Sequence, residues 1–289
     1  MSSSPFALAG HRSDVAARLR AAGCVFAEDE ADLLISAAGT ADDLAALVAR
    51  RVDGLPLEHV LGWALFCGVR VAVAPGVFVP RPRTELLVRE AARLLAAPPR
   101  SVLVDLCCGS GALGLAVAAR VREPVRLHAT DLDEAAVACA RRNVEPLGGR
   151  VYQGDLFTPL PGELRGRVDV LIANVPYVPT SDIALLPPEA RLYEPRLALD
   201  GGADGLDVLR RVATEAPDWL APTGHLLVET SERQAARAAA IMRDAGLRPR
   251  VVHDPDLDAT ALIGVAVPAG RGLSVEVHTA RDVRTSSAR

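Results

Sequence analysis

The chain has 289 residues, with 32 lysine and arginine residues against 36 acidic ones, and all 32 are arginine. The absence of lysine excludes a phosphate loop of the G-x-x-x-x-G-K type, Schiff-base catalysis and a protein-kinase ATP site, because each requires a lysine amine. The net charge of −4 argues against a protein that binds mainly to nucleic-acid backbone. Half of the residues are hydrophobic, which is typical of a globular protein with a large core.

The sequence carries no sign of export, membrane insertion or metal binding. The first residues lack a basic region followed by an apolar core, and the most apolar stretch, 101–119, contains Asp105 and three glycines. We therefore expect neither a signal peptide nor a membrane span, and a cytoplasmic location. No two of the cysteines form a C-x-x-C pair and the histidines show no ligand spacing, so we expect no metal site.

The N-terminal part predicts helices, followed by a β-hairpin. Residues 11–53 are rich in alanine and leucine, with acidic residues where helices would begin and glycines where they would end. Alternating valine and phenylalanine with glycine and proline breaks predict a hairpin over 63–79. Thr84 is then a candidate N-cap for a helix that runs to about residue 97 and ends at the prolines 98–99.

From residue 101 onward the pattern is strand, turn and helix, repeated. This alternation predicts a parallel sheet with helices on both faces. The last two strands are joined by a short loop rather than a helix, which predicts one antiparallel strand within the sheet. Strands are expected at 101–106, 125–131, 150–155, 168–174, 225–230, 248–254 and 260–267, and helices at 111–121, 133–144, 204–217 and 231–245.

The first strand of this series leads into a glycine-rich loop, Asp105-Leu-Cys-Cys-Gly109-Ser-Gly111-Ala-Leu-Gly114. Glycines after a buried strand let the backbone turn tightly and let a ligand approach the N-terminus of the next helix. The second strand ends at Asp131, where a carboxylate can hold ribose hydroxyls. The pattern predicts a cofactor that contains a nucleoside, and a dinucleotide would show the same glycines and acid.

Two carboxylates favour S-adenosylmethionine. Asp105 can hold the ammonium group of its amino-acid part, directly or through water. Asp155 follows the third strand and can accept a hydrogen bond from the adenine amino group, with Leu156 and Phe157 flanking the ring; a turn cap is the alternative role for Asp155. A dehydrogenase would need a donor arrangement such as Y-x-x-x-K, which a chain without lysine cannot provide.

The fourth strand ends in Asn174-Val175-Pro176-Tyr177, the most specific signal in the chain. The nitrogen of a planar amide or aromatic amine is a poor nucleophile because its lone pair is delocalised. The side-chain carbonyl of Asn174 and the backbone carbonyl of Val175 can accept hydrogen bonds from such an NH2 group, and Tyr177 can pack against its plane. These acceptors would also stabilise the positive charge that develops on nitrogen. An ordinary turn is the alternative.

Several motifs, in order, resemble those of the protein-glutamine N5-methyltransferases, the HemK or release-factor methyltransferase group. VFVPRPRTELLV (77–88) resembles the entry to their catalytic domain, VDLCCGSGALGLAVA (104–118) their cofactor loop and NVPY (174–177) their N-P-P-Y motif. The run YEPRLALDGGADGL (193–206) resembles their E-P-x-x-A-L-x-G-G-x-D-G-L segment, which distinguishes them from other class I methyltransferases.

The resemblance implies a class I S-adenosylmethionine-dependent methyltransferase, an α/β Rossmann-like fold with a mostly parallel seven-stranded sheet, one strand antiparallel, plus a small N-terminal helical domain. It implies that S-adenosyl-L-methionine is bound by Asp105, Cys107, Cys108, Gly109, Ser110, Gly111, Asp131, Asp155, Leu156 and Asn174, and that the glutamine is held by Asn174, Val175, Pro176 and Tyr177. The corresponding division is a substrate-recognition domain (1–62), a β-hairpin linker (63–80), a catalytic domain (81–269) and a disordered tail (270–289). The expected partner is a protein with an exposed glutamine, a release factor or ribosomal protein, methylated by a monomeric enzyme without stable nucleic acid or membrane contact.

Two residues depart from the family pattern. Val175 replaces the first proline of N-P-P-Y, which keeps the backbone carbonyl but loses the restraint of proline on Asn174. Arg83 stands where the family has an acidic residue in P-R-x-[DE]-T-E. Three alternatives stay open: a paralogous group with another substrate, an adenine-N6 nucleic-acid methyltransferase, which would need base flipping and a basic recognition region, and a catalytically weak cofactor-binding module.

Overall fold

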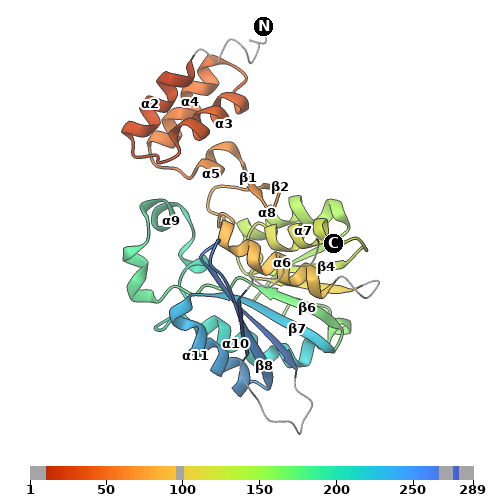
Figure 1. The fold of residues 1–289 in the computed structure, drawn as a ribbon. Coiled ribbons are helices and arrows are strands. Elements are labelled where there is room, and N and C mark those ends of the chain that lie inside the picture. The colour runs from red at the N-terminus through yellow and green to blue at the C-terminus, as the bar shows by residue number, and fades with distance from the viewer. Residues whose placement is uncertain (1–10, 96–100, 267–275, 280–289) are drawn as a thin grey trace, which may run out of the picture.

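The computed structural model describes residues 11–95, 101–266 and 276–279. Its centre is an eight-stranded sheet in the order β10-β8-β9-β7-β6-β3-β4-β5 (Figure 1). Neighbouring strands are parallel except where β9 pairs antiparallel with β7 and with β8. The strands are β3 (Val102–Leu106), β4 (Arg126–Asp131), β5 (Arg150–Gln153), β6 (Val168–Ala173), β7 (Leu220–Thr230), β8 (Leu247–Asp254), β9 (Ala259–Ala266) and β10 (Glu276–Thr279).

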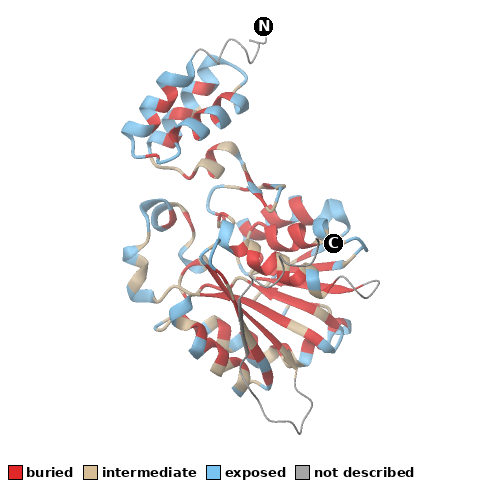
Figure 2. Ribbon diagram, in the orientation of Figure 1, coloured by how far each residue is buried: buried red, intermediate tan, exposed pale blue. Residues whose placement is uncertain are grey.

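Helices cover both faces of the sheet, and each face has its own hydrophobic core. Along β3, Leu103 belongs to one cluster, whereas Val104 and Leu106 belong to the other, because successive side chains of a strand point to opposite faces. The strands at the centre are almost wholly buried (Figure 2). One cluster includes residues of α6 (Glu85–Leu94), α7 (Ala112–Arg120) and α8 (Glu134–Val144), and the other includes residues of α10 (Asp207–Trp219) and α11 (Glu232–Asp244).

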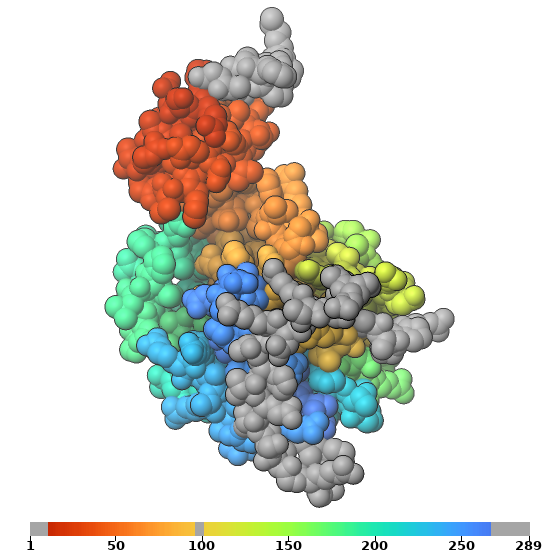
Figure 3. All heavy atoms as spheres, viewed as in Figure 1, coloured from red at the N-terminus to blue at the C-terminus, as the bar shows by residue number. Residues whose placement is uncertain are grey.

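The N-terminal helices form a separate unit with a core of their own. They are α2 (Arg12–Ala21), α3 (Ala27–Ala37), α4 (Ala41–Val52) and α5 (Leu57–Leu61), and the hairpin β1 (Trp63–Phe66) with β2 (Val69–Ala72) follows them. Arg51 of α4 donates to Glu30 of α3 at 2.6 Å and to Glu189 of α9 (Pro188–Tyr193) at 2.6 Å. Figure 3 shows the N-terminal helices resting on the segment that carries α9.

The predicted α/β architecture is confirmed, including the single antiparallel strand, which is β9, but the sheet has eight strands rather than seven because β10 is added at its edge. Several details differ. Thr84 has helical backbone angles and its side chain makes no capping hydrogen bond. The short helices of 180–193 were not predicted, because their proline-rich sequence has no apolar period. Within the tail predicted to be disordered, residues 276–279 form β10 along β8. The remainder of that tail and the predicted helix end at 96–99 lie outside the described residues.

Candidate active site

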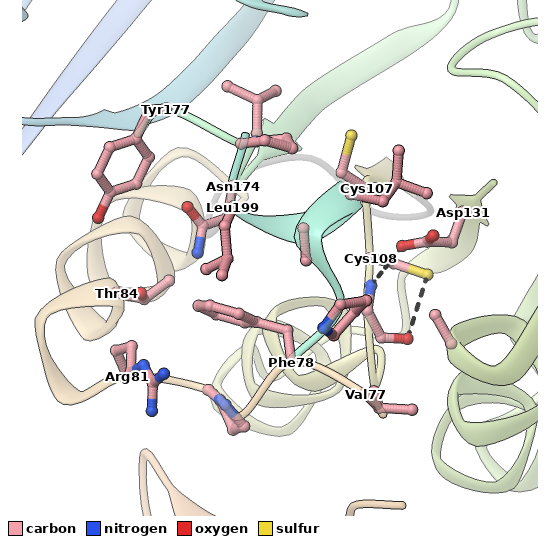
Figure 4. Close-up of a pocket in the computed structure, with 18 of the residues that line it drawn as sticks. Val77, Phe78, Arg81, Thr84, Cys107, Cys108, Asp131, Asn174, Tyr177 and Leu199 are labelled. Atoms are coloured by element: carbon pink, nitrogen blue, oxygen red, sulfur yellow. Dashed lines mark hydrogen bonds between the residues drawn. The ribbon is translucent and has the colours of Figure 1, made fainter. Parts of the chain in front are cut away.

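A large cavity lies beside the carboxyl ends of the parallel strands. The chain passes from β3 to β4 on one side, whereas β6 lies on the other, and ligands of open α/β sheets bind where the strand order reverses in this way. The cavity has a volume of about 680 Å³. In Figure 4, Cys107, Cys108 and Asp131 lie at one end and Arg81, Thr84 and Tyr177 at the other. We call these the β4 end and the α6 end.

The glycine-rich loop at the β4 end turns tightly at Gly109, as its glycines predict, and also at Cys107, which was not predicted. Cys107 and Gly109 have φ values of 53° and 54°, in the left-handed region. A Cβ on Gly109 would meet no atom within 4 Å and would therefore project into open space. Because glycine has no Cβ, this part of the cavity stays open to a ligand. The carboxylate of Asp131 accepts a hydrogen bond from the Gly109 backbone at 2.8 Å, which fixes the loop against the end of β4. Cys107, Cys108, Gly109 and Ser110 all line the cavity.

Gly111 has a different part in the loop, since it does not line the cavity. It precedes α7 with φ of 75°, and a Cβ there would lie 2.8 Å from Val144 of α8. Its small size therefore lets α7 approach α8. Asn143, one residue before Val144, donates to the Ser110 carbonyl at 2.8 Å and exchanges two hydrogen bonds with the Ala72 backbone. Asn143 thus joins the loop to the β-hairpin, a contact that its position inside a predicted helix did not reveal.

Asp105 lies beneath the loop rather than on the cavity surface. It is 1% exposed, and its Oδ2 accepts from the Gly114 backbone at 2.9 Å. Its Oδ1 is buried and has no partner among the described residues. Burial raises the pKa of this carboxyl to about 7, and the nearby charge of Asp131 adds to the effect, whereas the Gly114 N–H opposes it. A ligand ammonium group or a bridging water would satisfy the free oxygen.

The residues expected to hold the nucleoside meet at the β4 end. Asp131 lines the cavity, and burial raises the pKa of its carboxyl despite hydrogen bonds from backbone N–H groups. Asp155 and Leu156 also line it, and Arg211 of α10 donates to Asp155 at 2.6 Å. Phe157 was predicted to flank the adenine ring, and that is wrong. It is buried and stacks on Trp219, with the ring centres 5.5 Å apart.

The Asn-Val-Pro-Tyr motif follows β6 and lines the middle and the α6 end of the cavity. The Oδ1 atom of Asn174 is buried and has no partner among the described residues. Val175 also lines the cavity, but it is 2% exposed and packs in one of the two hydrophobic cores of the sheet. The hydroxyl of Tyr177 donates to Glu229 Oε1 at 2.9 Å. Burial and the Glu229 charge raise the Tyr177 pKa, so the hydroxyl stays protonated.

Glycines of the 193–206 run hold this motif in place. A Cβ on Gly201 would lie 2.6 Å from the Pro176 carbonyl. Gly205 has φ of 75°, and a Cβ there would overlap the Tyr177 carbonyl and the Gln234 side chain. Gln234 in turn donates to the Tyr177 carbonyl at 3.0 Å. The backbone of the run therefore packs directly on the motif, which explains why side chains are absent at these positions.

Sequence reasoning missed several residues at the α6 end. Phe78 and Thr84 line the cavity, and the Thr84 hydroxyl is buried without a partner among the described residues. Arg81 donates to both carboxylate oxygens of Glu194, each at 2.6 Å, and joins the entry segment to the 193–206 run. Burial raises the Glu194 pKa, against the opposing charge of Arg81. The P-R-P-R sequence after the hairpin was the available signal, but it does not show which side chains face inward.

Comparison with known proteins identifies the family. A methyltransferase small domain matches residues 69–185. The release factor glutamine methyltransferase of Geobacter sulfurreducens is 40% identical over 210 residues, which are 71% of this chain and 72% of that protein. The chain belongs to the release factor glutamine methyltransferase family. A further relative, 40% identical over 204 residues and 69% of each chain, is the 4-amino-L-phenylalanine/4-methylamino-L-phenylalanine methyltransferase of Streptomyces pristinaespiralis.

A solved structure supports the fold. The hMettl16 catalytic domain, in complex with the MAT2A 3'UTR hairpin 1, has a TM-score of 0.56 at 12% identity and covers 86% of this chain and 84% of that one. This likeness confirms the predicted class I methyltransferase fold, and membership of the family confirms the predicted S-adenosylmethionine cofactor.

The cavity fits that cofactor. The open space over Gly109 and the unsatisfied oxygen of Asp105 lie around the same loop, and the carboxylates of Asp131 and Asp155 belong to the residues that line the cavity. Within the described part of the chain, no His, Cys, Asp or Glu side chains cluster as a metal site would require. No helix there is long and apolar enough to cross a membrane.

Proposed function

We propose that this enzyme transfers the methyl group of S-adenosylmethionine to the side-chain amide nitrogen of a glutamine in a protein, with a release factor as the first candidate and a ribosomal protein as the next. The observation that carries the proposal is the buried Asn174 Oδ1 without a partner, at the end of β6 in the cavity that also fits the cofactor. A buried acceptor without a donor costs free energy, so a ligand NH2 group that donates to it is strongly favoured.

The residues of the motif provide the chemistry that an amide nitrogen needs. The bound cofactor would supply an electrophilic methyl group on a sulfonium. Asn174 Oδ1 and the Val175 carbonyl accept from the two N–H bonds, which orients the nitrogen and stabilises the positive charge that grows on it. The ring of Tyr177 packs against the amide plane. The proton passes to water after transfer.

We also propose that Asp105, Asp131, Asp155 and the loop residues 107–110 bind the cofactor, that Gly111 supports this loop by letting α7 approach α8, and that residues 1–62 help to recognise the protein substrate. The contact between Arg51 and Glu189 supports the role of residues 1–62, because Glu189 lines the cavity. A protein docked on the N-terminal helices would therefore lie next to the cavity. We further propose a monomer that acts in the cytoplasm without stable nucleic acid contact, in agreement with its net charge of −4.

One observation favours a second candidate function. The guanidinium of Arg83 lies 5.9 Å from the centre of the Tyr177 ring. Tyr177 is the ring against which the group to be methylated would pack. A positive charge beside this ring would attract the carboxylate of a small substrate. The Streptomyces pristinaespiralis relative is named for methylation of 4-amino-L-phenylalanine, a free amino acid with an aromatic amine. N-methylation of such an amino acid is the alternative for this chain.

The test is a panel of acceptors incubated with the protein and radiolabelled S-adenosylmethionine. The panel contains the release factor and ribosomal proteins of the same organism, 4-amino-L-phenylalanine and a DNA duplex. Label on a glutamine of the release factor supports the proposal, and label on the free amino acid supports the second candidate. Label on DNA would contradict both.

A further inference from the structure

Arg83 is a cation at the α6 end of the cavity whose hydrogen-bonding capacity is only partly used. Its side chain lines the cavity and is 49% exposed. Its Nε donates to Glu229 Oε1 at 3.2 Å, the same oxygen that accepts from Tyr177. Its two terminal nitrogens have no hydrogen-bond partner among the described residues. A guanidinium carries five donors in a planar fork, so one edge of this fork is available to a ligand.

Two other charged residues of the cavity lining are held in short ion pairs. Arg81 is held by both oxygens of the Glu194 carboxylate. Glu189 accepts from Arg51 at 2.6 Å. Arg83 differs from Arg81 in how firmly it is paired: its ion pair with Glu229 is 3.2 Å long, against 2.6 Å for Arg81 with Glu194, and neither terminal nitrogen of Arg83 takes part in it. A ligand anion there would replace water at the free edge of Arg83 without breaking an existing ion pair.

The surroundings of Arg83 specify where such an anion would sit. Thr84 follows it in the chain, and its buried hydroxyl has no partner among the described residues. Figure 4 shows Thr84 and Tyr177 at the same end of the cavity. The acceptor group packs against the ring of Tyr177. An anionic group bound by Arg83 would therefore belong to the same substrate molecule and lie close to the methylated nitrogen. The Thr84 hydroxyl can donate to that ligand as well.

We propose that Arg83 binds a carboxylate of the substrate and thereby determines which substrates the enzyme accepts. The inference rests on the proposed function, because it places the acceptor nitrogen at Asn174. Guanidinium and carboxylate match in shape and charge, and such charge-assisted pairs are among the stronger hydrogen bonds. The carboxylate has two possible sources: an acidic side chain beside the acceptor glutamine of a protein, or the α-carboxylate of a free amino acid.

The test compares matched probes that differ only in the carboxylate. The wild-type protein, Arg83→Gln and Arg83→Lys are saturated with S-adenosylhomocysteine, and binding is measured by calorimetry. The first pair is 4-amino-L-phenylalanine and its carboxamide. The second pair consists of two peptides with a central glutamine, followed by glutamate in one and by glutamine in the other. The ratio of the two dissociation constants within a pair is independent of the fraction of protein that is folded. Arg93→Gln, an exposed arginine of α6 away from the cavity, is the control with the same charge change.

The wild type and Arg93→Gln are expected to bind the carboxylate member of at least one pair about tenfold to a hundredfold more tightly, and Arg83→Gln to lose that preference. Arg83→Lys should keep part of it, because lysine retains the charge but not the fork. Preference within the amino-acid pair or the peptide pair identifies the source. Equal binding within both pairs in the wild type, or a preference that Arg83→Gln retains, would overturn the inference. This experiment measures binding and does not depend on methyl transfer. If none of the acceptors in the panel were methylated, that would count against the proposed function, whereas the binding preference could still be interpreted.

Discussion

The hydroxyl of Tyr177 donates to Glu229, whose side chain at the end of β7 is 4% exposed and also accepts from Arg83. The two residues are 52 positions apart in the chain. The aromatic ring of the motif is therefore held by a buried carboxylate from the neighbouring strand, and its orientation depends on that hydrogen bond.

Tyr177→Phe removes the donor and leaves a buried carboxylate oxygen with one partner fewer. We expect the free energy of unfolding to fall by about 1–3 kcal/mol, measured by denaturant titration. Methyl transfer should also decrease through kcat, because the ring is held less firmly. Glu229→Gln keeps an oxygen that can accept from Tyr177 and should lose less activity than Tyr177→Phe. Equal stability of wild type and Tyr177→Phe would show that the hydrogen bond does not hold the ring.

Asp105 should make cofactor binding depend on pH. Its pKa of about 7 means that the ligand-free protein keeps this carboxyl largely protonated below pH 7. The ammonium group of the cofactor favours the ionised form, so calorimetric affinity for S-adenosylmethionine is expected to rise with pH, by up to about tenfold per unit below 7. Asp105→Asn keeps the shape and cannot ionise, and its affinity should change less with pH over the same range. The same slope in both proteins would assign the pH dependence to other groups.

The same raised pKa predicts a trend in stability. Between the unfolded pKa near 4 and the folded value of about 7, the folded protein binds a proton that the unfolded chain lacks. The contribution of Asp105 to stability is thus present at low pH and is lost as pH rises through this window. Denaturant titrations of the ligand-free protein should show a steeper decline from pH 5 to pH 7.5 in the wild type than in Asp105→Asn. A steeper decline of stability in Asp105→Asn would contradict a raised pKa of Asp105 in the folded protein.

Gly205 and Gly166 form a matched pair for testing the packing behind the motif. Both have positive φ, 75° and 67°, but a Cβ on Gly205 would overlap the Tyr177 carbonyl and a Cβ on Gly166 would meet nothing within 4 Å. Gly166→Ala should therefore cost about 1–2 kcal/mol through its backbone alone. Gly205→Ala should cost more and also reduce kcat, because Tyr177 must shift. Unfolding titrations and steady-state rates on both variants check this, and equal effects would contradict it.

Much of the architecture was predictable, because local patterns report on it. Alternating strands and helices specified the parallel sheet, and the helix-free link between the last two strands specified the antiparallel β9. Glycines after β3 and acids after β4 and β5 identified the β4 end of the cavity, since the carboxyl ends of parallel strands meet at one edge. The Asn-Val-Pro-Tyr sequence marked the proposed acceptor position, because it too follows the carboxyl end of a parallel strand.

The remainder depends on contacts between distant residues, which no local pattern encodes. Glu229 reaches Tyr177 and Arg211 reaches Asp155 only after the sheet has formed. Phe157 was placed beside the adenine because it follows Leu156, but it turns into the core and stacks on Trp219. Thr84 has the residue type of a cap, yet its hydroxyl lies unpaired at the cavity. Whether such a side chain faces the core, a hydrogen-bond partner or the cavity depends on the packing around it.

The central claim is that Asn174 holds the amide nitrogen that is methylated. The most direct measurement compares wild type with Asn174→Ala, using the release factor as acceptor, with tandem mass spectrometry to locate the methyl group and calorimetry to measure cofactor binding. We expect methylation of a glutamine side-chain nitrogen, a loss of about 100-fold or more in kcat for Asn174→Ala, and cofactor affinity that changes much less. A methyl group on another type of atom, or transfer at an unchanged rate in Asn174→Ala, would contradict the account.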